Sequence, residues 1–139
     1  MGKMTENEFR KLEYLSGYID AKIEHERINY VIESYKELKK SAKSARNEMI
    51  SEKNKTDMSD YITKIEEKEK DLIEVYRDLE KTLTEIEEKI QKIEDKDERL
   101  ILTERFINRK SMRDIAGKYY YSRRNLYRIY KRALNNLDI

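Results

Sequence analysis

The residues best suited to chemistry are cations gathered near one end of the sequence. Between Arg109 and Arg132 there are nine lysines and arginines and a single acid, Asp114. An arginine can hydrogen-bond the edge of guanine through two atoms at once, and an asparagine such as Asn125 can do the same with adenine. A segment of this kind predicts binding to a polyanion, and above all to a nucleic acid, whose bases these side chains can contact.

A helix with two different faces is expected to carry most of these groups. It is predicted over about residues 122–137, with Ser122 as its N-cap, and the free amides of its first turn suit a phosphate. Its outer face holds the predicted DNA-binding residues, which are Ser122, Arg123, Arg124, Asn125, Tyr127, Arg128, Lys131 and Arg132. Arg109, Lys110 and Arg113, which lie outside this helix, are expected to hold the DNA backbone and to make affinity fall with salt.

Two further short helices must position the reading helix. The first is expected over Asp97–Ile107, and a break at residues 108–110 separates it from the second. The second begins after Ser111, whose hydroxyl can accept from the amide of Asp114, and the small side chain of Ala116 lets neighbouring helices cross closely. The expected core positions of the three helices are Leu100, Phe106, Ile115, Tyr119, Tyr121, Leu126, Ile129, Ala133 and Leu137.

These motifs resemble a known group of proteins. The segment Arg99–Leu134 is similar to the sigma factor region 4-like helix-turn-helix of small phage-encoded transcriptional regulators of the ArpU and RinA type. The matching positions are Leu102, Arg105-Phe106-Ile107, Ser111, Ile115-Ala116, Tyr121-Ser122-Arg123, Leu126-Tyr127-Arg128 and Lys131-Arg132-Ala133-Leu134. The resemblance covers about the last quarter of the chain. It implies sequence-specific binding of double-stranded DNA in transcription regulation, with RNA polymerase as a candidate partner of the preceding helices.

The sequence departs from the usual pattern at the turn before the reading helix. The position four residues after Ala116 is commonly glycine, because the chain often has a positive φ there. This sequence has Tyr120 instead, and a bulky residue at positive φ is strained. We therefore expect a reshaped turn in which Tyr120 points to solvent or to the DNA backbone.

Two long helices are predicted before this region. Residues 8–40 repeat apolar side chains mostly at steps of three or four, from Phe9 through Ile23 to Leu38. Residues 41–57 lose this rhythm and are expected to form a polar loop. In residues 58–93 the apolar side chains then recur at alternating steps of four and three, with Glu69 as the one polar interruption. This apolar stripe, the seam, needs another helix to cover it. An antiparallel hairpin is the simplest arrangement, although a homodimer through the same helices is equally open.

The predicted fold class is therefore all-α. A long antiparallel helical hairpin, or coiled-coil arm, is expected over residues 1–95, with its polar loop at about 41–57. A three-helix helix-turn-helix domain is expected over residues 96–139. The formal charge supports this division, because it is −5 up to residue 95 and +7 beyond it. A basic domain carried on a weakly acidic arm is typical of a nucleic-acid-binding protein.

The composition argues against several other classes. Cysteine is absent and His25, expected at the surface, is the one histidine, so we expect no metal, no cofactor and no catalysis. No apolar run reaches the length of a membrane span, and a cytoplasmic location is expected. Two alternatives stay open: a small terminase subunit for phage DNA packaging, and a helical protein–protein interaction module that does not touch DNA.

Overall fold

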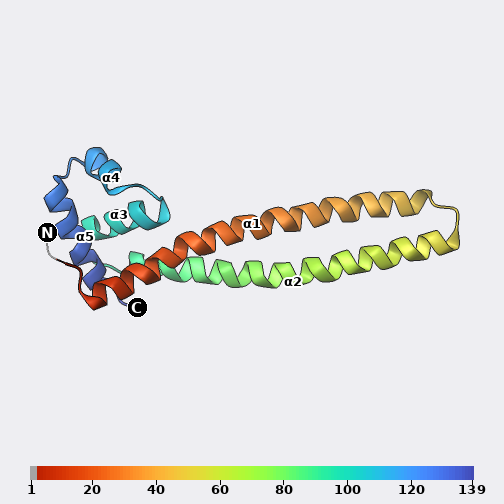
Figure 1. Ribbon diagram of the computed structural model, residues 1–139, viewed down its shortest axis with the longest axis horizontal. Helices are drawn as coiled ribbons and strands as arrows, with labels where there is room; N and C mark the ends of the chain where they lie inside the picture. The colour runs from red at the N-terminus through yellow and green to blue at the C-terminus, as the bar shows by residue number, and fades with distance from the viewer. Residues whose placement is uncertain (1–2) are drawn as a thin grey trace. The chain divides into compact units, whose positions relative to one another are not determined.

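The chain folds into helices joined by short connections. The computed structural model describes residues 3–139, and every regular element in that range is helical. The elements are α1 (Glu6–Glu48), α2 (Glu52–Gln91), α3 (Lys96–Leu102), a π-helical turn η1 (Thr103–Ile107), α4 (Met112–Tyr119) and α5 (Arg123–Asn136). The two long helices pack against each other as an antiparallel hairpin, and the short helices follow it (Figure 1). The predicted fold class is confirmed.

The helices form two compact units. One unit comprises the residues up to Lys22 together with Lys81–Ile139, and the other comprises Ile23–Glu80. The boundary expected at residues 95 and 96 therefore does not separate the compact parts. The reason is that the first turns of α1 bind the end of α5: the Nζ of Lys11 donates to the carbonyl of Asn135 at 2.8 Å, and the Nδ2 of Asn135 donates to Glu8 at 3.1 Å.

The connection between α1 and α2 is much shorter than the sequence suggested. The polar loop predicted at residues 41–57 is wrong, because only residues 49–51 lie outside the two helices. Ala42 is buried between them, and Arg46 donates to the hydroxyl of Ser59 at 3.4 Å. Contacts of this kind compensate for the modest helix propensity of Ser, Asn and Thr. Ser51 then caps α2 by accepting from the amide of Asn54.

The buried face of α1 coincides only in part with the stripe predicted for it, which also contained the buried Leu15 and Ile28. Phe9, Ile23 and Leu38 are 58%, 52% and 46% exposed, so the interpretation of these three as core is wrong. The buried positions are Glu8, Lys11, Leu15, Tyr18, Ala21, Ile28, Ile32 and Ala42. The rest of this face was not predicted, in part because two of its members, Glu8 and Lys11, are charged. Glu8 is satisfied by a reciprocal capping box, in which it accepts from the amide of Thr5 at 2.7 Å and donates its own amide to the Thr5 hydroxyl at 3.1 Å.

His25 belongs to the packed seam of the hairpin. Its side chain is only 13% exposed and lies 3.4 Å from a carboxylate oxygen of Glu80. The ring stacks on Tyr76, with 4.0 Å between ring centroids and 20° between planes. The expectation of a surface histidine is therefore wrong. Its position between two glutamates in the sequence gave no sign of this, because the aromatic partner comes from the other helix.

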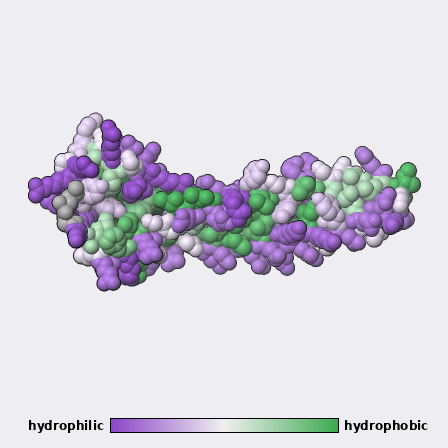
Figure 2. Space-filling view, in the orientation of Figure 1, coloured by the Kyte–Doolittle hydropathy of each residue, from purple (hydrophilic) through white to green (hydrophobic). Residues whose placement is uncertain are grey.

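Polar surface covers most of the hairpin, but apolar side chains interrupt it. Figure 2 shows hydrophobic atoms between the hydrophilic ones along the two long helices. The exposed large apolar side chains of the Ile23–Glu80 unit are Ile23, Tyr30, Leu38, Ile50, Tyr61 and Val75. Even so, none of the helices within residues 3–139 combines the length and the apolar character needed to cross a bilayer.

Glu69 is the one buried charge of the hairpin seam in α2. It is 8% exposed, and its Oε1 accepts from the Nζ of Lys39 at 2.8 Å. This hydrogen bond raises the pKa of Lys39. The second oxygen, Oε2, has no partner within the described chain. A buried acceptor without a partner costs free energy, so this pair fixes the pairing of the helices more than it stabilises them.

We expect opposite effects from breaking and from replacing this pair. Lys39→Met should lower the free energy of unfolding by about 1–3 kcal/mol, because Glu69 would then be buried without a cation. The double variant Lys39→Met, Glu69→Leu should unfold at least at the wild-type temperature, because it removes both charges. Thermal unfolding followed by circular dichroism measures both. A double variant less stable than Lys39→Met alone would contradict this account.

Candidate nucleic-acid interface

The interface is built on α5, whose first turn is capped as predicted. Ser122 has an extended backbone and its hydroxyl accepts from the amide of Asn125 at 3.1 Å. The predicted inner face is buried, and its members Leu126, Ile129, Ala133 and Leu137 are at most 5% exposed. Tyr130 and Leu134, which were not predicted, are buried beside them. Because this face is apolar and packs mainly on α3, the opposite face of α5 must point to solvent.

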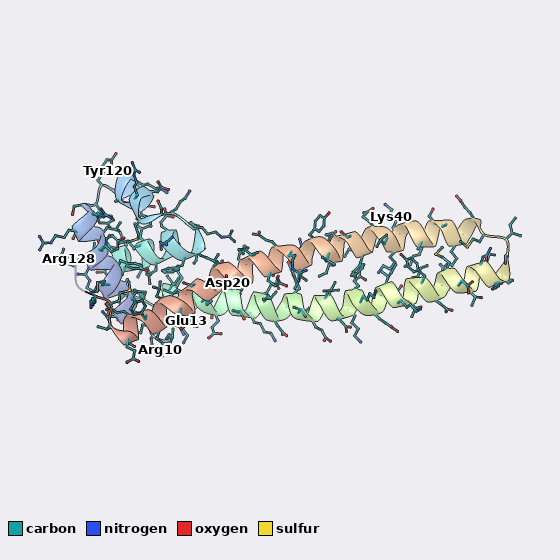
Figure 3. The ribbon with its side chains drawn as sticks, viewed as in Figure 1. Arg10, Glu13, Asp20, Lys40, Tyr120 and Arg128 are labelled. Carbon is teal, nitrogen blue, oxygen red and sulfur yellow. The ribbon has the colours of Figure 1, made fainter. Side chains whose placement is uncertain are left out.

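The exposed face at the beginning of α5 is cationic. Ser122, Arg123, Arg124 and Arg128 are exposed, and Asn125 is half-buried. Figure 3 shows the side chain of Arg128 extending away from the helix. The Nη2 of Arg128 donates to the Oδ1 of Asn125 at 2.6 Å. The two side chains therefore present a joint hydrogen-bonding surface, beside a shallow depression of about 360 Å³ lined by Ser122, Arg124, Asn125 and Arg128.

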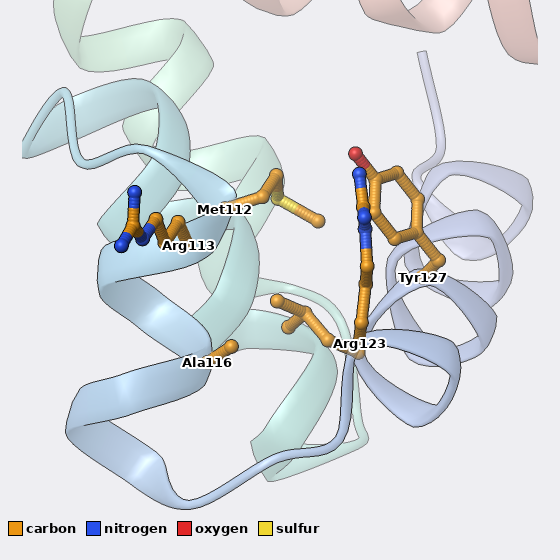
Figure 4. Close-up of a pocket in the computed structure, with 6 residues that line it drawn as sticks. Met112, Arg113, Ala116, Arg123 and Tyr127 are labelled. Atoms are coloured by element: carbon orange, nitrogen blue, oxygen red, sulfur yellow. The ribbon is translucent and has the colours of Figure 1, made fainter.

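A second depression lies between α4 and α5. It encloses about 460 Å³ and is lined by Met112, Arg113, Ala116, Arg123, Leu126 and Tyr127. Figure 4 shows the side chain of Met112 directed toward α5, whereas the guanidinium of Arg113 turns away from it. Tyr127 is half-buried and meets the ring of Tyr130 edge to face, with centroids 6.3 Å apart. This groove thus has an apolar floor and a cationic rim.

Two predicted site residues on α5 also contact other parts of the protein. Lys131 donates to the carbonyl of Lys3 at 3.4 Å, and its charge helps to lower the pKa of Glu8. The Nε of Arg132 lies 3.3 Å from Glu98. Both belong to the second half of α5, where the helix packs against α1 and α3. These contacts help to hold the second half of α5, although the side chain of Arg132 remains 50% exposed.

Sequence reasoning did not identify Glu98, a buried acid that joins α3 to α5. Its side chain is 1% exposed and accepts from Asn136 at 2.7 Å as well as from Arg132. A signal was present in the sequence, because Glu98 precedes the buried pair Ile101 and Leu102 by three and four residues and so shares their helical face. An acid on such a face requires partners, and α5 provides them.

Glu104 joins η1 to α4 in a similar way. Its carboxylate is 5% exposed and accepts from the Nδ2 of Asn108, the Nζ of Lys118 at 3.3 Å and the hydroxyl of Tyr119 at 3.2 Å. These hydrogen bonds, that of Asn108 first, hold the pKa of Glu104 below its ordinary value although burial acts to raise it. The carboxylate is thus kept ionised, and it fixes the start of the turn that leads to α5.

The predicted cap of α4 is present. Ser111 has an extended backbone, and its hydroxyl accepts from the amide of Asp114 at 3.1 Å. Of the three cations expected outside α5, Arg113 lines the groove beside Arg123. Lys110 is exposed next to Glu104, Asp114 and Lys118. Arg109 has a φ of 58°, and its charge acts on Tyr18 of α1, whose pKa burial raises to about 12. Arg109 and Lys110 therefore do not line either depression of α5.

The turn between α4 and α5 keeps the ordinary backbone path with an unusual residue. Tyr120 has φ 60° and ψ 34°, a left-handed conformation, so the expectation of a reshaped turn is wrong. The amides of Tyr120 and Tyr121 both donate to the carbonyl of Ala116, which closes the end of α4. A tyrosine at this position costs about 1 kcal/mol relative to glycine. Its side chain points to solvent, one of the two directions predicted from the sequence, and is 94% exposed.

Comparison of the chain with protein-family models, with curated proteins and with solved structures finds no match. The interface is therefore defined by its own geometry. Residues of α4 and α5 bring together Arg113, Arg123, Arg124, Asn125, Tyr127 and Arg128 at one end of the helix pair.

We expect Glu104→Ala to lower the free energy of unfolding by about 1–3 kcal/mol, because three donors lose a buried acceptor. The folded-state pKa of Glu104 is lowered, so its contribution is present above the ordinary pKa of 4.5 and is lost as the pH falls below it. Urea unfolding at a series of pH values measures this. Wild type and variant should converge in acid, whereas the exposed-site control Glu13→Ala should follow wild type throughout; a constant gap at all pH values would refute the assignment.

Proposed function

We propose that the protein binds double-stranded DNA by placing the beginning of α5 in the major groove, with α4 and α5 acting as a helix-turn-helix. One observation carries the proposal: α5 buries its apolar face completely while its capped first two turns expose three arginines and Asn125 beside them. A helix of this width fits the major groove, and the residues of its first turns reach the base edges.

The chemistry of each side chain supports a division of roles. Arg124, Asn125 and Arg128 border one depression and are suited to base edges, since guanidinium and amide groups can each form paired hydrogen bonds there. Arg113 and Arg123, on the rim of the groove between α4 and α5, are suited to phosphates. Two cations on phosphates would give a slope of about −2 in a plot of log affinity against log salt.

Arg124→Ala and Arg128→Ala should each weaken binding to a preferred site by between about 5-fold and 100-fold and should relax its base preference. The site is first selected by the wild-type protein from a pool of randomised duplexes, and affinity is then measured by fluorescence anisotropy at several salt concentrations. Because both arginines are assigned to base edges, each variant should keep nearly the salt slope of wild type.

Arg10→Ala is the matched control for these variants. Arg10 is an exposed arginine on α1 in the same compact unit, and its guanidinium donates to the Oδ1 of Asn7 at 3.0 Å. It should bind DNA as wild type does. If Arg10→Ala lost as much affinity as Arg124→Ala, the binding would depend on net charge and the reading face would be assigned wrongly.

A role in transcription regulation, of the phage type that the sequence resembles, is the cellular function we propose. The exposed apolar side chains of the hairpin, such as Ile23, Tyr30 and Val75, support a protein contact there, with a second copy of the chain or RNA polymerase as candidates.

Solution mass distinguishes this role from DNA packaging. A regulator should have the mass of one or two chains in light scattering, because a reading helix is used singly or on two half-sites. A ring of many subunits would instead favour a small terminase subunit. The measurement is made at two protein concentrations, so that association through the hairpin is detected.

A further inference from the structure

Tyr120 is held in a backbone conformation that its side chain does not favour. Its φ of 60° and ψ of 34° lie in the region that glycine enters freely and that the β-carbon of other residues opposes. The turn has no freedom to relax, because two successive amides donate to the carbonyl of Ala116. The only other described non-glycine residue with a positive φ is Arg109, in the connection before α4.

The tyrosines on either side of Tyr120 both have acidic partners elsewhere in the same helical unit. The hydroxyl of Tyr119 donates to Glu104 at 3.2 Å. Tyr121 is half-buried, and burial together with the nearby carboxylate of Asp97 raises its pKa. The side chain of Tyr120 is 94% exposed and forms no hydrogen bond or ring contact within residues 3–139. Its ring therefore contributes no packing that would offset the backbone strain.

Tyr120 stands next to the cationic end of α5. It precedes the N-cap Ser122 by two residues, and Arg123 and Arg124 follow immediately. Figure 3 shows its side chain extending outward from the end of α4. Exposed cations at this end attract phosphate groups, and a tyrosine hydroxyl is a suitable donor to a phosphate oxygen. Strained residues with unsupported side chains are typical of binding sites, where the contact is made with another molecule.

We propose that Tyr120 is a further DNA contact, whose phenol hydroxyl donates a hydrogen bond to a backbone phosphate at the edge of the groove that α5 enters. This inference rests on the proposed DNA-binding function and adds a residue to it. The strained turn fixes the direction of the ring before binding, so little freedom is lost when the contact forms. Because the phenol is uncharged, the contact releases no counterion and should not change the salt dependence.

Two substitutions separate the backbone strain from the contact. Tyr120→Gly should raise the thermal midpoint by about 3 °C, because glycine accepts the positive φ, and should weaken DNA binding about 5-fold, because the hydroxyl is lost. Tyr120→Phe should weaken binding to a similar degree without changing the thermal midpoint. In both variants the salt slope should equal that of wild type. Affinity is measured by anisotropy on the duplex selected by the wild-type protein.

The controls make each outcome decisive. Arg109→Gly relieves the same kind of strain and should raise the thermal midpoint similarly, and Phe9→Ala removes an exposed aromatic ring of α1 and should leave DNA affinity unchanged. Wild-type affinity in both Tyr120 variants overturns the inference while leaving the proposed function intact. Wild-type affinity in Tyr120→Phe alone overturns the hydrogen bond to phosphate. A wild-type protein that selects no duplex refutes the proposed function itself.

Discussion

The burial of one face of α5 is the constraint on which the rest of the C-terminal helices depends. Leu126, Ala133 and Leu137 are at most 1% exposed, and a 14-residue helix with such a face cannot turn without exposing it to water. Its rotation is therefore fixed, and the arginines of its first turns are exposed as a consequence. The cationic surface is a product of core packing, and no interaction among the arginines is needed to create it.

Buried carboxylates then set the position of the short helices along that core. Glu98 is bound by side chains of α5, and Glu104 is bound by residues that follow η1 and by α4. A carboxylate with several donors is fixed in place more strictly than an apolar side chain, because hydrogen bonds depend on distance and angle. The hydrophobic core brings the helices together, and the hydrogen bonds of these acids fix the position of each helix along the core.

Periodicity was sufficient to predict the helices, the caps at Ser111 and Ser122 and the inner face of α5, because each depends on residues close in sequence. It failed where a partner from a distant segment decided the outcome. The positions of Lys131 and Arg132 in the sequence did not indicate that acids of α1 and α3 would lie beside them. The same is true of His25, whose aromatic partner lies on α2, and of residues 41–57, which become helical because the opposite helix pairs with them.

The hydrogen bond between Lys11 and Asn135 joins residues that are 124 positions apart. During synthesis the first turns of α1 leave the ribosome long before their partner has been made, so this unit cannot form until α5 has been synthesised. Contacts of such long sequence separation slow folding, whereas a hairpin of neighbouring helices forms early. The helices of the hairpin should therefore form before the contact between the beginning of α1 and α5 is made.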